Sequence, residues 1–327
     1  MNKTDTCQSL SVADHVTPIL ADRGQHLAEV NVGEIFRQIR QSGLVMLRDF
    51  NINLAGFEAF TGRFCDAFHD VGTRQSLLAS DGDGYTSEVH RKNFNLFVHS
   101  EGAYRPWPPP PDLCFFNCVQ PWDNSGGETT LVDGVQFLEK LPVDLRHRFG
   151  QQGVIYEACW DKERWRTEFS VRNKDELHSL LNGRPEYEYQ FDDDLIHIRC
   201  HAAAISTSLG DIPAFANGLL AHLPGISHSR WQGLIAYSKD TNRIFFGDGE
   251  VIPDPVINGL IDIQDEIAIN HDWMRNDLLL VDNKRFMHGR RMTDGDCERV
   301  IRSRFGSLSQ EHADNHKASA SSPSYLR

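Results

Sequence analysis

The chain has 327 residues, and 40% of them are hydrophobic, which is enough for a substantial core. Its formal net charge is -13, which repels nucleic acid and anionic lipid, because both ligands require clustered Lys and Arg. We therefore expect no nucleic-acid partner, and a cationic or zwitterionic small molecule suits the charge better.

The sequence predicts neither a secretory leader nor a membrane span. No early apolar run resembles the core of a signal peptide, and no stretch reaches the ~18 uninterrupted apolar residues of a membrane helix. The seven cysteines are scattered, odd in number and without C-x-x-C pairs, so we expect reduced thiols rather than disulfides or a thiolate zinc site. The expected compartment is the cytoplasm.

Helices are expected before the first strands. Residues 1–25 are polar and unpatterned, which predicts a flexible lead-in. Apolar side chains near helical spacing predict a helix over about 27–41, with Gly43 as its stop. The apolar run 44–47 predicts a short strand. The next helix is expected over about 54–68, where four Phe residues form one stripe typical of a core-facing side.

Beyond Phe94 the pattern changes to short apolar runs separated by Pro and Gly, which predicts a β-rich fold. These runs cover residues 113–119, 129–132, 196–198, 243–246, 278–281 and 300–305. The mixed segment 165–181 predicts a helical or irregular insertion. No repeat or linker divides the chain, so we expect a single domain over residues 26–307 and a disordered tail over 308–327.

A His-x-Glu triplet closes one apolar run. His99 and Glu101 follow residues 94–98, and on a strand residues i and i+2 point to the same face, so the two side chains could converge on one ion. A second match, His312 to Asp314, lies in the polar tail, where no scaffold would fix a ligand. By itself the first triplet could also be a surface pair at a strand end.

A distant histidine could complete the site. The apolar run 278–281 enters a turn at Asp282-Asn283 and then reaches His288. Two histidines and one carboxylate form a facial triad, which leaves three metal positions for a bidentate oxoacid and O2. Arg299 follows eleven residues later, and a buried dicarboxylate requires such a guanidinium. An exposed strand Arg is the alternative interpretation.

In their order these motifs resemble the taurine dioxygenase family of Fe(II)/2-oxoglutarate enzymes, and especially its branch around clavaminate synthase and the syringomycin-pathway hydroxylase. The resemblance spans roughly residues 40–306. It rests on His99-Ser100-Glu101-Gly102-Ala103-Tyr104, Trp107-Pro108, Phe115-Phe116-Asn117-Cys118, Gly126-Gly127-Glu128-Thr129, Phe246-Gly247-Asp248-Gly249 and Val281-Asp282-Asn283. It implies a mainly β fold with flanking helices, a double-stranded β-helix or jelly roll, that binds Fe(II), 2-oxoglutarate and O2.

Transferred position by position, the resemblance also implies roles for individual residues. Iron would be bound by His99, Glu101 and His288, and the distal carboxylate of 2-oxoglutarate by Thr129 and Arg299. Relatives often carry a second Arg four residues further on. This chain has Ser303 there, which leaves open whether Arg302 or Arg304 assists. Three further residues could line the substrate pocket or have a structural role, namely Tyr85, Asn95 and Asn217.

The implied reaction oxidises an amino-acid-like small molecule in specialised metabolism, such as antibiotic biosynthesis, while 2-oxoglutarate becomes succinate and CO2. A carboxylate ligand favours hydroxylation, desaturation or epoxidation over halogenation, and hydroxylation is the default expectation. The run Asp192-Asp193-Asp194 could attract a substrate cation, although a solvated loop is its commoner role. Two alternatives stay open: the same chemistry on a substrate tethered to a carrier protein, and a non-catalytic metal-binding or ligand-sensing jelly roll.

Overall fold

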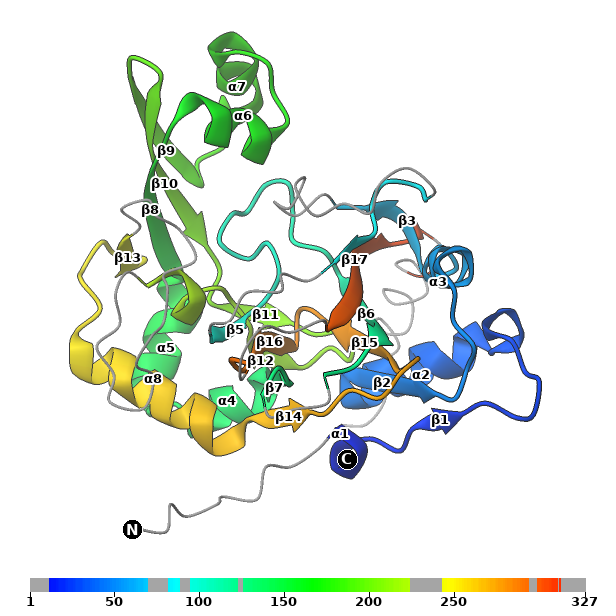
Figure 1. Ribbon diagram of the computed structural model, residues 1–327. Coiled ribbons are helices and arrows are strands. Elements are labelled where there is room, and N and C mark those ends of the chain that lie inside the picture. Colours follow the sequence, from blue (N-terminus) through cyan, green and yellow to red (C-terminus); the bar gives the residue numbers. More distant parts are fainter. Residues whose placement is uncertain are drawn as a thin grey trace.

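Two facing β-sheets form the centre of the structure, and a third sheet projects from it (Figure 1). A computed structural model describes residues 12–69, 82–88, 95–122, 126–223, 243–293, 299–310 and 312. The larger central sheet has the order β1 (Ile19–Leu20), β2 (Leu44–Arg48), β15 (Leu278–Asp282), β6 (Leu113–Gln120), β17 (Val300–Leu308) and β3 (Cys65–Phe68), with β4 (Ser87–Glu88) also paired to β17.

The smaller central sheet has the order β14 (Ile269–His271), β7 (Thr129–Asp133), β16 (Phe286–Arg290) and β5 (Leu96–His99). Apolar side chains from both sheets fill the space between them, including Phe116 and Phe305 from the larger sheet and Leu131 and Phe286 from the smaller one. This arrangement of two packed sheets is the jelly roll that the sequence predicted.

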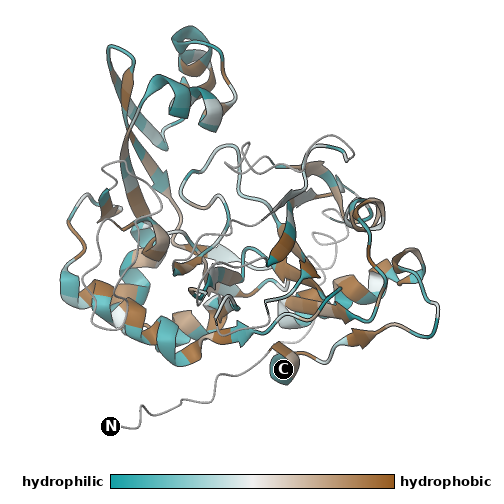
Figure 2. Ribbon diagram, in the orientation of Figure 1, coloured by the Kyte–Doolittle hydropathy of each residue, from teal (hydrophilic) through white to brown (hydrophobic). Residues whose placement is uncertain are grey.

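Side chains on β6 alternate between two hydrophobic cores, one on the outer face of the larger sheet and one inside the jelly roll. Leu113 and Phe115 point to the outer face of the larger sheet, whereas Cys114 and Phe116 point into the jelly roll. Because side chains alternate along a strand, a sheet covered on both faces has a nearly continuous apolar sequence. The helices that cover the outer face, α2 (Val32–Ser42) and α3 (Leu54–Thr61), show both apolar and polar colours in Figure 2.

Helix α2 ends before Gly43, as its sequence predicts, but it begins at Val32 rather than near residue 27. The Asn31 side chain accepts a hydrogen bond from the Glu34 backbone N–H at 3.2 Å, which caps the first turn. Gly43 ends the helix with a φ of 77°, a left-handed conformation that glycine adopts without steric cost. The 3-10 helix η1 (Leu27–Glu29) precedes α2.

A third sheet forms an arm beside the jelly roll, with the strand order β13 (Arg243–Phe246), β8 (Val154–Trp160), β10 (Leu195–Ala202) and β9 (Tyr187–Asp192). The predicted insertion consists of the helices α6 (Lys162–Phe169) and α7 (Lys174–Leu181), which lie at the far end of this arm (Figure 1). The remaining elements are α4 (Gly134–Lys140), α5 (Val143–Gln152), β11 (Ile205–Thr207), β12 (Pro213–Phe215), η2 (Leu220–His222) and α8 (Asp254–Ile267).

Two early segments differ from the prediction. The helix expected to reach Phe68 ends at Thr61, and Cys65–Phe68 forms β3, because these residues pair with 306–308 of β17. In the segment predicted as a lead-in, α1 (Val12–His15) and β1 are formed, and β1 pairs with β2 in parallel. Residues 1–11 and 313–327 lie outside the described residues, so most of the predicted tail does too.

The described cysteines are free thiols, namely Cys65, Cys114, Cys118, Cys159 and Cys200, whereas Cys7 and Cys297 lie outside the described residues. Among the helices in the described part of the chain, none has the length and apolar character needed to cross a membrane.

Candidate metal centre

The structure brings His99, Glu101 and His288 together inside the jelly roll. His99 is the last residue of β5 and lies directly opposite His288 on the antiparallel strand β16. One ligand atom from each of the three side chains lies within 4.8 Å of the others. The Glu101 carboxylate oxygen Oε2 is 3.7 Å from Nε2 of each histidine. This spacing is suited to a single metal ion.

The His99 ring is held in the orientation that a metal ligand requires. Its Nδ1 lies 3.2 Å from the carbonyl oxygen of Phe97. Because a carbonyl can only accept, Nδ1 carries the proton, and Nε2 keeps its lone pair on the side of Glu101. Such a hydrogen bond fixes both the tautomer and the ring angle of a metal-binding histidine.

Glu101 does not lie on the strand from which the sequence argument placed it. Strand β5 ends at His99, and Glu101 is the first residue of the following turn. Its backbone N–H donates to Asn283 Oδ1 at 2.7 Å, and its carbonyl accepts from Asn283 Nδ2 at 3.0 Å. The two side chains therefore converge, as expected, but through a turn held by Asn283 rather than through strand alternation.

The protonation states also suit a divalent cation. Burial lowers the pKa of His288, which favours the neutral imidazole. Burial by itself would raise the pKa of Glu101, but the contacts with His288 and His99 outweigh it and hold this pKa below its ordinary value. Neutral imidazoles and an ionised carboxylate are the forms that bind metal, so the donor set fits Fe(II).

A buried arginine, Arg299, lies beside Thr129, and these are the two residues that the resemblance assigns to the 2-oxoglutarate carboxylate. Arg299 is 5% exposed, which rules out the exposed-strand interpretation. Its Nη2 donates to Thr129 Oγ1 at 3.3 Å, and Trp273 Nε1 donates to the same oxygen at 2.9 Å. The hydroxyl and the guanidinium are thus held side by side.

The Gly126-Gly127 turn allows this approach. Both glycines have positive φ, 89° and 78°. A Cβ on Gly126 would lie 2.0 Å from the Met292 carbonyl oxygen, and a Cβ on Gly127 would lie 2.9 Å from the Thr293 methyl group. Side chains at these two positions would push the turn away from residues 292–293, and Thr129 with it.

The sequence interpretation missed Arg290. This residue is 5% exposed and lies two positions after His288 on β16, directly opposite Thr129 on β7. Directly opposed residues of antiparallel strands have side chains on the same face, so Arg290 shares a face with Thr129 and His288. Strand alternation from His288 could have indicated it, but the sequence alone did not distinguish it from an exposed arginine.

Neither Arg302 nor Arg304 shares the face of β17 that points into the jelly roll. Arg304 points to the opposite face of β17, where its Nη1 and Nη2 bind the two carboxylate oxygens of Asp83 at 2.6 Å. Alternation places Arg302 on that same face. Ser303 shares the face of Ile301 and Phe305, which point into the jelly roll, and its hydroxyl lies 3.0 Å from that of Ser87 on β4.

The three residues suggested for the substrate pocket have structural contacts. The Asn217 carbonyl accepts from Ser100 N–H at 2.9 Å, and its side chain binds Ala204 and Leu219. Asn95 Oδ1 accepts from the Met292 N–H, and Tyr85 is 44% exposed.

Two other sequence candidates lie elsewhere. The run Asp192-Asp193-Asp194 is exposed at the end of β9 and in the turn that leads to β10, where Asp194 pairs with Lys162 and Lys174. The His312 ring packs on Phe36 at 4.1 Å between ring centroids, and Asp314 lies outside the described residues.

Similarity to known proteins agrees with this site. The family described as taurine catabolism dioxygenase TauD, TfdA family matches residues 17–304. The chain belongs to this family. It is therefore an Fe(II)- and 2-oxoglutarate-dependent dioxygenase that also uses O2, and the His-Glu-His cluster lies where its jelly roll can hold the metal.

Relatives of this TauD-family chain include biosynthetic proteins. It is 22% identical to the dapdiamide synthesis protein DdaC of Enterobacter agglomerans, over 90% of this chain and 91% of DdaC. It is 23% identical to a clavaminate synthase-like protein of Arabidopsis thaliana, over 78% and 79% of the two chains. Its fold is similar to that of PvcB from Pseudomonas aeruginosa, with a TM-score of 0.53, 14% identity and coverage of 90% and 86%. PvcB is described as an Fe, α-ketoglutarate-dependent oxygenase from an isonitrile synthetic pathway.

Proposed function

We propose that His99, Glu101 and His288 bind Fe(II), and that the enzyme hydroxylates an unactivated C–H bond of a small amino-acid-like molecule. The observation that carries the metal assignment is the convergence of the three ligand atoms within 4.8 Å of one another. Three protein ligands leave coordination positions for the cosubstrate and O2.

We further propose that Arg299 and Thr129 bind the distal carboxylate of 2-oxoglutarate. The support is the buried guanidinium and its 3.3 Å hydrogen bond to the Thr129 hydroxyl. A carboxylate in this position would accept charge-assisted hydrogen bonds, which are stronger than neutral ones. The Gly126-Gly127 turn contributes by letting Thr129 come close to Arg299.

When bound, Fe(II) and 2-oxoglutarate supply the oxidation, with succinate and CO2 as co-products. The protein's own residues orient the reactants and exclude water. Phe116 and Phe305 lie beside His288, with ring centroids 5.1 and 6.5 Å from the imidazole, and both are buried. These aromatic side chains make the interior of the jelly roll apolar around the proposed metal site, which limits side reactions with water.

The names of the relatives support a role in specialised metabolism, since DdaC is a dapdiamide synthesis protein and PvcB belongs to an isonitrile synthetic pathway. Glu101 supplies a carboxylate ligand and so leaves no coordination position for a halide in its place. This favours hydroxylation, with desaturation or epoxidation as the alternative outcomes.

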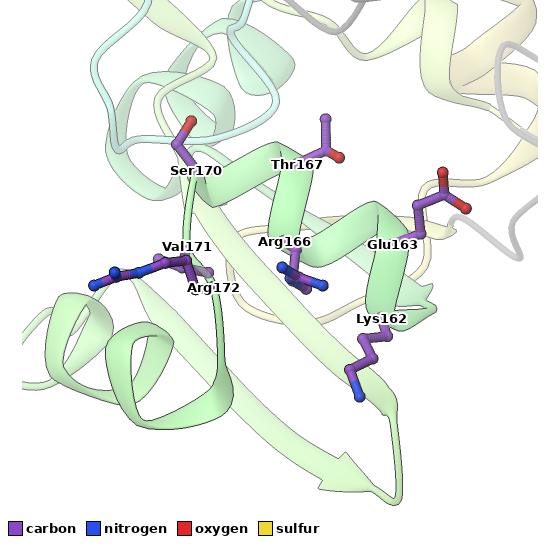
Figure 3. A pocket seen from close by; sticks show the side chains of 7 residues that line it. All are labelled: Lys162, Glu163, Arg166, Thr167, Ser170, Val171 and Arg172. Atoms are coloured by element: carbon purple, nitrogen blue, oxygen red, sulfur yellow. The ribbon is translucent and has the colours of Figure 1, made fainter.

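A carrier-tethered substrate is the second candidate, and it would need a docking surface for an acidic carrier. The arm carries a groove of about 500 Å³ on α6. Figure 3 shows its lining by Lys162, Glu163, Arg166, Thr167, Ser170, Val171 and Arg172. Lys162 pairs with Asp194 at 3.3 Å and Arg172 with Glu176 at 2.6 Å, so two of the three cations are already neutralised. We therefore favour a free small molecule.

The test is a coupled assay with Fe(II), 2-oxoglutarate, O2 and a panel of free amino acids. We expect at least one compound to accelerate succinate formation and to gain one oxygen atom by mass spectrometry. Loss of two hydrogens would indicate desaturation instead. If no 2-oxoglutarate binds to iron-loaded protein, the chain is a non-catalytic metal-binding or ligand-sensing jelly roll.

A further inference from the structure

Another buried arginine follows the proposed metal ligand Glu101 closely in the sequence. Arg105 is 6% exposed and follows Glu101 by four residues. Its backbone N–H donates to the Gly102 carbonyl at 3.3 Å, which closes a tight turn directly after the proposed ligand. A turn of this kind keeps its first and last Cα atoms within ~7 Å, so Arg105 stays close to Glu101.

One edge of the Arg105 guanidinium is not used by the protein. Among the described residues, its hydrogen bonds and ion pairs run through Nη1, which contacts the Glu168 carbonyl and, at 3.1 Å, Glu168 Oε2. The buried Nε has no hydrogen-bond partner in the described structure. A buried donor without a partner costs free energy, so a ligand group that accepts a hydrogen bond from this Nε would be stabilised.

Two other arginines show what this edge binds. Arg48 holds both oxygens of Asp277 through Nε and Nη2, at 2.7 and 2.8 Å. Arg285 holds Asp133 through the same two nitrogens, at 3.1 and 2.8 Å. The Nε/Nη2 edge is a fork that matches a carboxylate. In Arg105 this fork lacks a protein carboxylate.

The carboxylate that Arg105 contacts has a second cationic partner. Glu168 is buried, and its Oε2 binds Arg105 while its Oε1 lies 2.5 Å from Arg164 Nη2. The Tyr104 hydroxyl also donates to Oε2, at 2.7 Å. Glu168 is therefore shared between two guanidinium groups, and Glu101, the other carboxylate whose charge acts on Arg105, is assigned to the metal.

The guanidinium contacts the arm, because its partner Glu168 belongs to α6. In Figure 1 the chain between β5 and β6 runs between the arm and β17. Arg105 thus lies on the segment that leads from the proposed ligands His99 and Glu101 to β6, between the arm and β17.

We propose that the free Nε/Nη2 edge of Arg105 binds a carboxylate of the substrate and thereby selects amino-acid-like acids over their neutral derivatives. The inference rests on the proposed function, because the position of the iron defines the substrate site. It names a group for the substrate that is separate from the pair Arg299 and Thr129, which we assign to 2-oxoglutarate.

The experiment compares acids with amides. Anaerobic enzyme loaded with Fe(II) and 2-oxoglutarate is titrated by calorimetry with the standard L-amino acids and with their primary carboxamides. We expect the best acid to bind roughly 10- to 100-fold more tightly than its amide, the range typical of hydrogen bonds to a charged group. In Arg105→Met this preference should disappear, while the affinity for 2-oxoglutarate stays unchanged. Arg105→Lys keeps the charge but not the fork and should give an intermediate preference.

Arg164→Met is the matched control, because it removes the other guanidinium from the same Glu168 carboxylate. It should retain the preference for the acid. Equal binding of acid and amide by the wild type, or the same preference in Arg105→Met, contradicts the inference, and so does a panel in which no acid binds. The visible charge-transfer band of the Fe(II)–2-oxoglutarate complex is recorded on the same samples and separates the two proposals. If the band is absent, the proposed function is wrong. If the band is present but the enzyme does not prefer the acid, only the inference about Arg105 is wrong.

Discussion

The carboxamide of Asn283 binds the backbone of Glu101 in both directions, accepting from its N–H at 2.7 Å and donating to its carbonyl at 3.0 Å. The same Nδ2 also donates to the Pro111 carbonyl at 2.9 Å. Asn283 lies in the turn between β15 and β16, five residues before His288. The segment that delivers the second histidine therefore also fixes the carboxylate, although 182 residues separate Asn283 from Glu101.

We predict that Asn283→Ala weakens metal binding roughly 10- to 100-fold, the range seen when groups that orient metal ligands are removed. Glu101 would lose both of its backbone hydrogen bonds to the Asn283 side chain, and with them its fixed position. Anaerobic competition titration with Co(II) measures the affinity. Asn283→Asp keeps the acceptor for Glu101 N–H but not the donors, and we expect a smaller loss. Wild-type affinity in folded Asn283→Ala would contradict a positioning role.

Arg299→Gln should weaken 2-oxoglutarate binding by about 3 kcal/mol, roughly 100-fold, because a buried charge-assisted contact is lost. Thr129→Val removes one hydroxyl and should cost about 1 kcal/mol. Anaerobic titration with 2-oxoglutarate gives both values. Metal affinity serves as the internal control, and it should stay at the wild-type level in both variants. An equal loss of metal binding would indicate general damage to the site.

Two glycine variants separate steric collision from backbone strain. Gly126→Ala places a Cβ 2.0 Å from the Met292 carbonyl oxygen, whereas Gly183 has a φ of 76° but open space around it. We expect Gly183→Ala to cost about 1–2 kcal/mol, from left-handed strain alone. Gly126→Ala should cost more and should also weaken 2-oxoglutarate binding. Urea unfolding measures the first quantity, and similar losses in the two variants would count against the close approach at Gly126.

Asp282 predicts a specific pH dependence of stability. Burial raises the pKa of Asp282 to about 7, against the backbone hydrogen bonds from Leu209 and Lys284 that favour the carboxylate. The folded state then holds the proton more tightly than the unfolded state. The contribution is fully present below the unfolded pKa of about 4 and is lost as the pH rises through about 7, by up to roughly 4 kcal/mol.

The matched variant is Asp282→Asn, which cannot titrate. Thermal unfolding of both proteins between pH 5 and pH 8 should show wild-type stability falling relative to the variant as the pH rises. The Asn side chain has one acceptor oxygen where Asp282 has two, and the hydrogen bond lost in this way lowers the stability by an amount that does not depend on pH. Parallel curves would mean that Asp282 is ionised throughout this range.

Many of the strands were predictable because their signals are local, whereas the members of the His99, Glu101 and His288 cluster were indicated by the family resemblance. Residues 113–119 and 278–281 are apolar throughout, as expected for strands covered on both faces, and β6 and β15 follow these runs closely. Strand β3 was missed because Phe68 continues a helical stripe of Phe residues, whereas its strand conformation depends on pairing with β17, more than 230 residues away.

The partners of the ligands could not be predicted from local pattern. Asn283 looks like a turn residue, and nothing near it in the sequence indicates Glu101 as its partner. Arg290 and Arg105 resemble surface arginines until the fold buries them. Glu101 was chosen correctly as a member of the cluster but for an incomplete reason, since its place depends on the Asn283 contact rather than on strand alternation.

The most direct test of the proposed site is an anaerobic titration of Fe(II)-loaded protein with 2-oxoglutarate, followed by its metal-to-ligand charge-transfer band in the visible. We predict a band in the wild type that saturates with 2-oxoglutarate and is absent from folded His288→Ala. A band of wild-type intensity in His288→Ala, or no band in folded, iron-loaded wild type, would contradict the assignment of His99, Glu101 and His288 as the iron ligands.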